Sequence, residues 1–168
     1  MEISERIKKV TEAPIDKVNR ERIRLESEGM EILNLGQAVP DYGPPEEALT
    51  ELIDNLKRDS IHQYTGDPGL ENLREEIADN LREKYRVNDA KPSEILITAG
   101  ANHAFCLALS LLCDEGSRWG LFSPYYLNHI MAIHGAGGEI DEIIPGNHLV
   151  YDFDKFEKLV KEKHLVAV

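Results

Sequence analysis

The carboxyl-terminal part of the chain alternates short apolar segments with longer helical ones, and this order constrains the fold more than any other feature. Four segments have the pattern of buried strands: 94–98, 119–122, 139–144 and 164–168. Helical patterns separate them, at 102–114, at 125–134 and from Asp152 or Asp154 onward. Because a helix between two strands carries the chain back across a sheet, this order predicts an α/β fold with a largely parallel sheet flanked by helices.

The amino-terminal part combines helical patterns with loops rich in proline and glycine. Apolar residues recur at helical spacing in three segments, which we predict to be helices: 14–29, 44–56 and 68–85. For the third helix, Asp67 suits the N-cap and Pro68 the first helical position. Residues 31–35 are expected to form a short extended segment.

Composition narrows the possible partners. The formal net charge is −12, from 31 acidic and 19 basic residues, and a surface of this sign repels phosphate backbones, so we expect no nucleic-acid partner. No apolar run approaches the roughly 18 residues of a membrane span, and the first residues lack the order of a signal peptide. We therefore expect a cytoplasmic protein without a membrane partner.

The last five residues, 164–168, are mostly apolar and read as a strand. An apolar strand left at the edge of a sheet would expose unpaired backbone groups. We therefore expect either that a longer protein has been cut here or that a partner completes the sheet.

A turn of small residues follows the segment 94–98 and opens the next helix. Ala99, Gly100 and Ala101 let a ligand approach the backbone, and the helix that begins near Asn102 offers free N–H groups and the positive end of its dipole. This arrangement suits a phosphate group. The same residues would also serve an ordinary tight turn between a strand and a helix.

Two further loops carry aromatic side chains that suit a phosphorylated ring. Tyr125 and Tyr126 follow the strand 119–122, at the sheet edge where α/β folds place ligands, and either ring can stack on a flat ligand. Tyr64 lies on a loop rich in glycine and proline, where its hydroxyl can donate to a phosphate. The alternatives are packing against another domain for the first pair and a plain surface position for Tyr64.

Motifs for other chemistries are missing. The six histidines show no HExxH spacing and the two cysteines no CxxC spacing, so we expect no metal site. The chain also lacks a Gly-x-Ser-x-Gly elbow and a Walker loop, which leaves acyl transfer and nucleotide hydrolysis without a motif.

The three loops occur in the order and near the spacing of the class I/II aminotransferases, the fold-type-I enzymes that use pyridoxal 5'-phosphate (PLP). Residues 34–45, NLGQAVPDYGPP, resemble the family's amino-terminal loop, and 64–74, YTGDPGLENLR, are similar to its Tyr-x-x-x-x-Gly-x-x-x-Leu-Arg motif. Residues 97–104, ITAGANHA, resemble its cofactor phosphate loop, and 123–126, SPYY, the segment with its ring-stacking aromatic. The resemblance covers nearly the whole chain.

The resemblance implies roles for residues in two of these segments. The backbone N–H groups of Ala101 and Asn102, which follow Gly100, would hold the phosphate of PLP. Tyr126 would stack on the pyridine ring, in preference to Tyr125.

It also implies a substrate contact and an assembly. Gly36 would lie near the substrate carboxylate, and Tyr64 would reach the cofactor phosphate of a neighbouring subunit, which makes the protein a homodimer with shared active sites. The complete protein would move an amino group between an amino acid and a 2-oxo acid.

A domain boundary is expected in one of two loops, 36–45 or 86–92. In the family's terms, residues 1–45 form an amino-terminal helical arm and small-domain segment. Residues 46–168 then form a partial, PLP-binding α/β large domain.

Several parts of the family pattern are missing from the 168 residues. These are the Asn-Pro-x-Gly motif, the aspartate that pairs with the pyridine nitrogen, the Schiff-base lysine and the arginine that grips the substrate. Without that lysine, the isolated chain is predicted to be inactive. Two alternatives stay open: a C–S lyase or aminocyclopropane-carboxylate synthase-like enzyme, and a non-catalytic truncated or split chain that only dimerises or binds a phosphate ligand.

Overall fold

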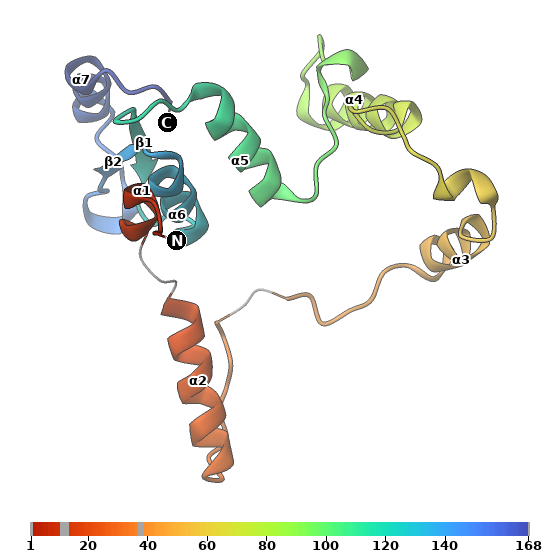
Figure 1. Ribbon diagram of the computed structural model, residues 1–168, viewed down its shortest axis with the longest axis horizontal. Coiled ribbons are helices and arrows are strands. Elements are labelled where there is room, and N and C mark those ends of the chain that lie inside the picture. The colour runs from red at the N-terminus through yellow and green to blue at the C-terminus, as the bar shows by residue number, and fades with distance from the viewer. Residues whose placement is uncertain (1, 11–13, 37–38, 168) are drawn as a thin grey trace. The chain divides into compact units, whose positions relative to one another are not determined.

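The structure is a computed structural model that describes residues 2–10, 14–36 and 39–167 (Figure 1). The helices are α1 (Glu5–Lys8), α2 (Pro14–Ser27), α3 (Glu46–Asn55), α4 (Glu71–Tyr85), α5 (Ala101–Leu112), α6 (Leu127–Ala136) and α7 (Phe153–Lys163). The strands are β1 (Arg118–Phe122) and β2 (Glu139–Ile143), and short 3₁₀ helices are η1 (Asp59–His62), η2 (Pro92–Glu94) and η3 (Asn147–Leu149). These elements confirm the α/β fold class.

The sheet is parallel and β1 lies at its centre. β1 and β2 pair in parallel, with Arg118 opposite Glu139, and α6 connects them. On the other side of β1, the Gly120 N–H donates to the carbonyl of Ala167 at 3.0 Å, and the Val166 N–H donates to the carbonyl of Arg118 at 2.8 Å. The strand predicted at 164–168 is therefore met only in part: His164 is the C-cap of α7, Ala167 makes a parallel bridge to Trp119 in the described part of the chain, and residue 168 lies outside that part.

The core of this unit lies between β1, α5 and α6. Leu109 of α5, Trp119 of β1 and Ile133 of α6 are buried together, and Phe105 packs against them. Helix α6 ends two residues after the predicted 134, because Gly137 takes a φ of +94° that favours glycine and its N–H bonds back into the helix. The chain thus returns directly from α6 into β2.

Residues 33–98 form a second compact unit, distinct from residues 2–32 and 99–167. In this unit α4 buries Ala78 and is joined to the following loop through arginines. Arg74 donates to the carbonyl of Pro92 at 2.8 Å, and Arg82 donates to the carbonyl of Ala90. The division of the chain at residue 45 refers to the domains of a complete family member and stays a prediction.

Helix α4 begins three residues later than predicted. Its N-cap is Leu70, not Asp67, and Pro68 precedes the helix. The intervening residues form a turn in which the N–H of Gly69 donates to the carbonyl of Gly66 at 2.9 Å. Gly69 has a φ of +92°, which is incompatible with an α-helical turn, so the helix starts only after it.

The prediction of a buried strand at 94–98 is wrong. This segment is extended, but it joins no sheet in the described part of the chain, and Leu96 is 53% exposed. Its backbone bonds instead to the loop before α4, since the N–H of Ile97 donates to the carbonyl of Pro68 at 3.0 Å. A strand needs a neighbouring strand as well as a suitable sequence, and α4 and its loop supply the neighbours here.

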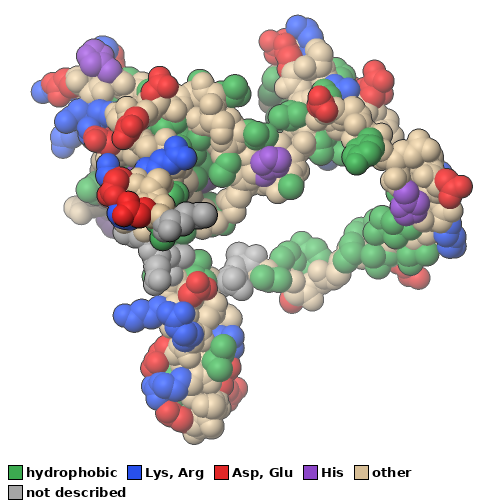
Figure 2. All heavy atoms as spheres, in the orientation of Figure 1, with side chains coloured by type: hydrophobic (Ala, Val, Ile, Leu, Met, Phe, Trp, Pro, Cys, Tyr) green, Lys and Arg blue, Asp and Glu red, His purple; other side chains and the backbone are tan. Residues whose placement is uncertain are grey.

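The expectation from the residue pattern that the helix at 102–114 is buried is also only partly met. Leu109 is buried in α5, whereas Leu111 is 85% exposed. Other helices leave apolar stripes open as well, and Figure 2 shows hydrophobic side chains at the surface along α3. Acidic and basic side chains are interspersed in the same view. Among the described helices, none combines the length and the apolar character that crossing a bilayer requires.

Candidate functional site

The amino terminus of α5 has the open geometry that anion binding requires. Gly100 precedes the helix with a φ of +83°, and a Cβ atom added there would meet nothing within 4 Å. The first turn holds no acidic residue, and the exposed Ala101 and Asn102 begin the helix. Because the first N–H groups of a helix have no partner within it and lie at its positive end, this turn suits a phosphate.

His103 organises the same turn, and the sequence reasoning missed it. Its Nδ1 atom accepts a hydrogen bond from the backbone N–H of Ala99 at 3.1 Å. A side chain in the first helical turn that reaches back to the residues before the helix is a known capping arrangement. The position of His103, three residues after Gly100, is the signal that could have indicated this role.

The two tyrosines after β1 have different surroundings. The Tyr125 hydroxyl donates to Oε1 of Glu142 at 2.6 Å, and this hydrogen bond raises the pKa of Tyr125 above its ordinary value. The ring of Tyr126, by contrast, is 54% exposed at the N-cap of α6. Of the pair, Tyr126 therefore has the more accessible ring, while Tyr125 is bonded to β2, and the stacking role of Tyr126 stays a prediction.

The segment that carries these tyrosines is tied to the sheet at its start. The backbone N–H of Ser123 donates to the carbonyl of Ile143 at 3.0 Å, and the hydroxyl of Tyr151 donates to the Ser123 carbonyl at 2.6 Å. The Phe122 ring packs edge-on against Tyr151, with centroids 4.9 Å apart. Residues distant in the sequence thus hold the loop at the carboxyl edge of β1.

The Gly100 turn and Tyr126 lie on the same pair of neighbouring helices. The ring of His129, in the first turn of α6, stacks on Phe105 of α5 with centroids 4.1 Å apart, and it meets Tyr126 edge-on at 5.4 Å. A cavity of about 430 Å³ between α1, α5 and α6 includes Asn102 in its wall. Two aromatic contacts through His129 therefore link Tyr126 to helix α5, which begins at the Gly100 turn.

Gly36 and Tyr64 belong to the other compact unit, 33–98. The N–H of Gly36 donates to Oδ1 of Asn34 at 3.0 Å; residues 37 and 38 of the same loop lie outside the described part. The side chain of Tyr64 is fully exposed and lines an open cavity of about 480 Å³ together with Arg74. Both residues are accessible to a ligand or a second chain, and their roles stay predictions.

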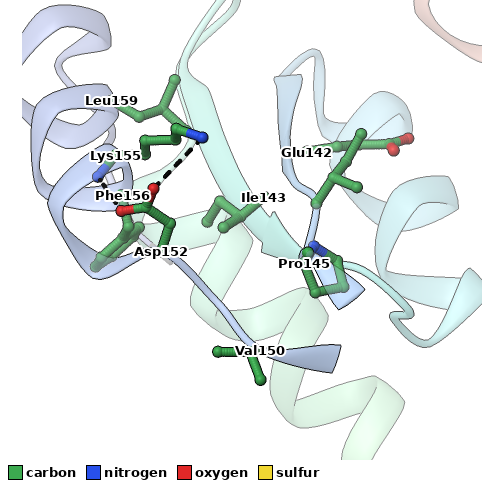
Figure 3. Close-up of a pocket in the computed structure, with 10 residues that line it drawn as sticks. Glu142, Ile143, Pro145, Val150, Asp152, Lys155, Phe156 and Leu159 are labelled. Atoms are coloured by element: carbon green, nitrogen blue, oxygen red, sulfur yellow. Dashed lines mark hydrogen bonds and ion pairs between the residues drawn. The ribbon is translucent and has the colours of Figure 1, made fainter. Parts of the chain in front are cut away.

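The cavity between the end of β2 and α7 was not singled out by the sequence. It has a volume of about 500 Å³, and Figure 3 shows Ile143, Val150, Phe156 and Leu159 around it. Its charged pair is Asp152 and Lys155: Asp152 caps α7 by accepting the backbone N–H of Lys155 at 3.1 Å, which lowers the pKa of the carboxyl group. That carboxylate is committed to the helix, so this cavity offers weaker chemistry than the Gly100 turn.

Comparison with known proteins shows which protein family this chain belongs to. The sequence profile described as "Aminotransferase class I and II" matches residues 30–168. The chain belongs to this aminotransferase family. The match includes the Gly100 turn and both tyrosines of the loop after β1.

Relatives and solved structures agree with this assignment. The chain is 33% identical over 132 residues to the aromatic aminotransferase ISS1 of Arabidopsis thaliana, covering 77% of this chain and 33% of that protein. It is 30% identical over 139 residues to the aspartate aminotransferase of Thermotoga maritima, covering 81% and 36%. The chain thus spans about a third of the length of these curated relatives.

The fold matches aminotransferase crystal structures over nearly all of this chain. The aspartate aminotransferase structure from Thermotoga maritima superposes with a TM-score of 0.83 at 27% identity, over 94% of this chain and 42% of that one. The alanine aminotransferase from Pyrococcus furiosus superposes with a TM-score of 0.85 at 26% identity, over 96% and 42%.

Proposed function

We propose that this chain is the amino-terminal, cofactor-binding part of a PLP-dependent aminotransferase. The complete protein would move an amino group between an amino acid and a 2-oxo acid, in the cytoplasm and as a homodimer. The observation that carries the proposal is the contact between α5 and α6, which joins the phosphate-suited turn at Gly100 to the exposed ring of Tyr126. Membership of the aminotransferase family supports the same chemistry.

The described residues fit the phosphate and the ring of the cofactor. The N–H groups of Ala101 and Asn102 would hold the phosphate, because Gly100 leaves open space there. Tyr126 would stack on the pyridine ring and orient it. When bound, PLP supplies the electron sink for amino-group chemistry, and the protein supplies binding, orientation and electrostatics.

Two further residues would complete the site in an assembled protein. Tyr64 would reach the cofactor phosphate of the neighbouring subunit, which agrees with its fully exposed side chain. Gly36 would lie near the substrate carboxylate. The Schiff-base lysine is not among the 168 residues, so we expect the chain alone to bind the cofactor without covalent attachment and without transferring amino groups.

The experiment removes one phosphate donor and leaves the helix intact. Proline is tolerated at the first position of a helix, so Ala101→Pro deletes a single N–H at the start of α5. Glu71→Pro makes the matched change at the first position of α4. Affinity for pyridoxamine 5'-phosphate, which cannot form a Schiff base with surface lysines, is measured by titration calorimetry, with pyridoxamine as the ligand that lacks the phosphate.

The proposal makes three expectations for this titration. The wild-type chain binds pyridoxamine phosphate more tightly than pyridoxamine, Ala101→Pro weakens the phosphate form by about 10- to 100-fold, and Glu71→Pro leaves it unchanged. Equal affinity for the two ligands, or no binding by the wild-type chain, would refute cofactor binding at this turn. Amino-group transfer by the chain alone would refute the expected inactivity.

A further inference from the structure

Four aromatic rings run from the buried core to the exposed face of the candidate site. Trp119 of β1 is 5% exposed, and its ring meets Phe105 of α5 edge-on, with centroids 6.5 Å apart. Phe105 stacks on His129 of α6 at 4.1 Å and 26°, and His129 meets Tyr126 at 5.4 Å and 89°. We call these four residues the aromatic ladder.

The last ring of the aromatic ladder needs support that the others do not. Trp119 and Phe105 are held by the hydrophobic core, whereas Tyr126 lies before the first turn of α6 with about half of its surface in solvent. An exposed ring loses rotamer freedom when a ligand binds, and that loss weakens binding unless neighbours hold the ring beforehand. Aromatic edge-to-face contacts supply such an orienting force.

Two neighbours in the first turn of α6 hold Tyr126. His129 contacts its ring edge-on, and the Nδ2 of Asn128 donates to its hydroxyl at 2.8 Å. His129 also contacts α5, because its other neighbour is Phe105, which lies one turn after the Gly100 turn. His129 therefore touches both Tyr126 and helix α5, and it links the orientation of the Tyr126 ring to the position of that helix.

We propose that His129 is a positioning residue, which holds the Tyr126 ring in a fixed orientation relative to the amino terminus of α5. The cofactor would then meet a stacking ring and a phosphate-binding turn that are already arranged before it arrives. This inference rests on the proposed function for its consequence in binding. The contact on which the inference depends, from Phe105 through His129 to Tyr126, can be measured without any ligand.

The first experiment tests that contact in the full chain by nuclear magnetic resonance. We expect nuclear Overhauser effects between the rings of His129 and Tyr126. We also expect the Tyr126 ring resonances to move toward those of free tyrosine in His129→Leu but not in His134→Leu, which makes the same substitution in the last turn of α6. Unchanged Tyr126 resonances in His129→Leu would overturn the proposal.

The second experiment tests the consequence by titration with pyridoxamine 5'-phosphate. His129→Leu should weaken binding by roughly 3- to 10-fold, the effect of losing one aromatic pair. His129→Phe, which keeps a flat ring, should stay within about twofold of the wild type. In a Tyr126→Leu background, His129→Leu should have no further effect, because a positioning residue acts only through its target.

The outcomes separate this inference from the proposed function. If His129→Leu weakens pyridoxamine phosphate binding as much in the Tyr126→Leu background as in the wild type, His129 does not act through Tyr126. That result would overturn the positioning role. A wild-type chain that binds no pyridoxamine phosphate would refute the proposed function, and the resonance experiment alone would then decide whether His129 holds Tyr126. Thermal unfolding of each variant distinguishes a lost contact from a lost fold.

Discussion

Gly69 is the residue whose substitution has the most sharply defined consequence in this structure. Its φ is +92°, and a Cβ atom added there would lie 2.6 Å from Cγ1 and 2.7 Å from Cβ of Ile97. Carbon atoms in contact normally sit about 3.5–4.0 Å apart, so Gly69→Ala must displace Ile97 by about an ångström. Ile97 resists this displacement, because its backbone N–H is bonded to the carbonyl of Pro68 at 3.0 Å.

Two separate costs add in Gly69→Ala. A left-handed backbone costs an L residue with a side chain about 1–2 kcal/mol, and overpacking against a fixed neighbour costs about 1–3 kcal/mol. The sum, about 2–5 kcal/mol, is a large part of the roughly 5–15 kcal/mol by which a native domain is stable. We therefore expect Gly69→Ala to unfold at a markedly lower urea concentration, or not to fold at all at 37 °C.

Matched glycines separate the two costs in urea unfolding followed by circular dichroism. Gly29→Ala has the same backbone strain, at a φ of +85°, but its added Cβ meets nothing within 4 Å, so it should lose only about 1–2 kcal/mol. Gly66→Ala lies in the same loop as Gly69 and meets only Pro68 Cδ at 3.8 Å, so it should be near neutral. A Gly69→Ala chain no less stable than Gly29→Ala would refute the clash with Ile97.

Three further predictions concern single contacts. Asp152→Ala removes the N-cap of α7 and should lower the melting temperature by about 2–6 °C in thermal unfolding. The hydrogen bond from Arg118 lowers the pKa of Asp141. This pair therefore stabilises the fold above the unfolded-state pKa of about 3.9, and its contribution is lost as pH falls through the folded pKa. The stability lost in Asp141→Asn should therefore shrink in acid. The Tyr125 pKa, raised by its bond to Glu142, should fall toward about 10 in Glu142→Ala when tyrosine ionisation is followed by ultraviolet absorbance.

Each of these has a result that would contradict it. An α7 of unchanged stability in Asp152→Ala would mean that the cap bond contributes nothing. A stability difference for Asp141→Asn that is the same at pH 3 and pH 7 would exclude the charge pair as its source. A Tyr125 that titrates identically with and without the Glu142 carboxylate would exclude their hydrogen bond in solution.

The family resemblance and the main elements could be recognised from sequence because each depends on residues close together in the chain. Helical spacing predicts α2, which ends at Ser27, and a capping aspartate predicts the start of α7, with Asp152 taken by the structure from the two candidates Asp152 and Asp154. The glycine pattern predicts a break after 134, which the structure places at Gly137, and the turn at Gly100. Such patterns encode the preferences of the local backbone, and these preferences survive in the folded chain.

Other features depend on pairs of residues that lie far apart in the chain. The choice between the two tyrosines after β1 follows from Glu142, which occupies Tyr125 and leaves Tyr126 to the solvent. The same is true of His129, whose role follows from Phe105 on another helix. Neither neighbour can be read from the segment that contains the tyrosine or the histidine.

The sequence alone predicted the six longer helices of the described residues, a turn at Gly100 that suits a phosphate and the enzyme family that the chain resembles, but not the short helix α1. The tertiary structure decided that 94–98 joins no strand in the described part of the chain, that α4 begins after Gly69 and that Tyr125 bonds to β2 while the Tyr126 ring stays exposed. The physical reason is that backbone preference acts between neighbours in the chain, whereas strand pairing, ring contacts and burial require partners that only folding brings together.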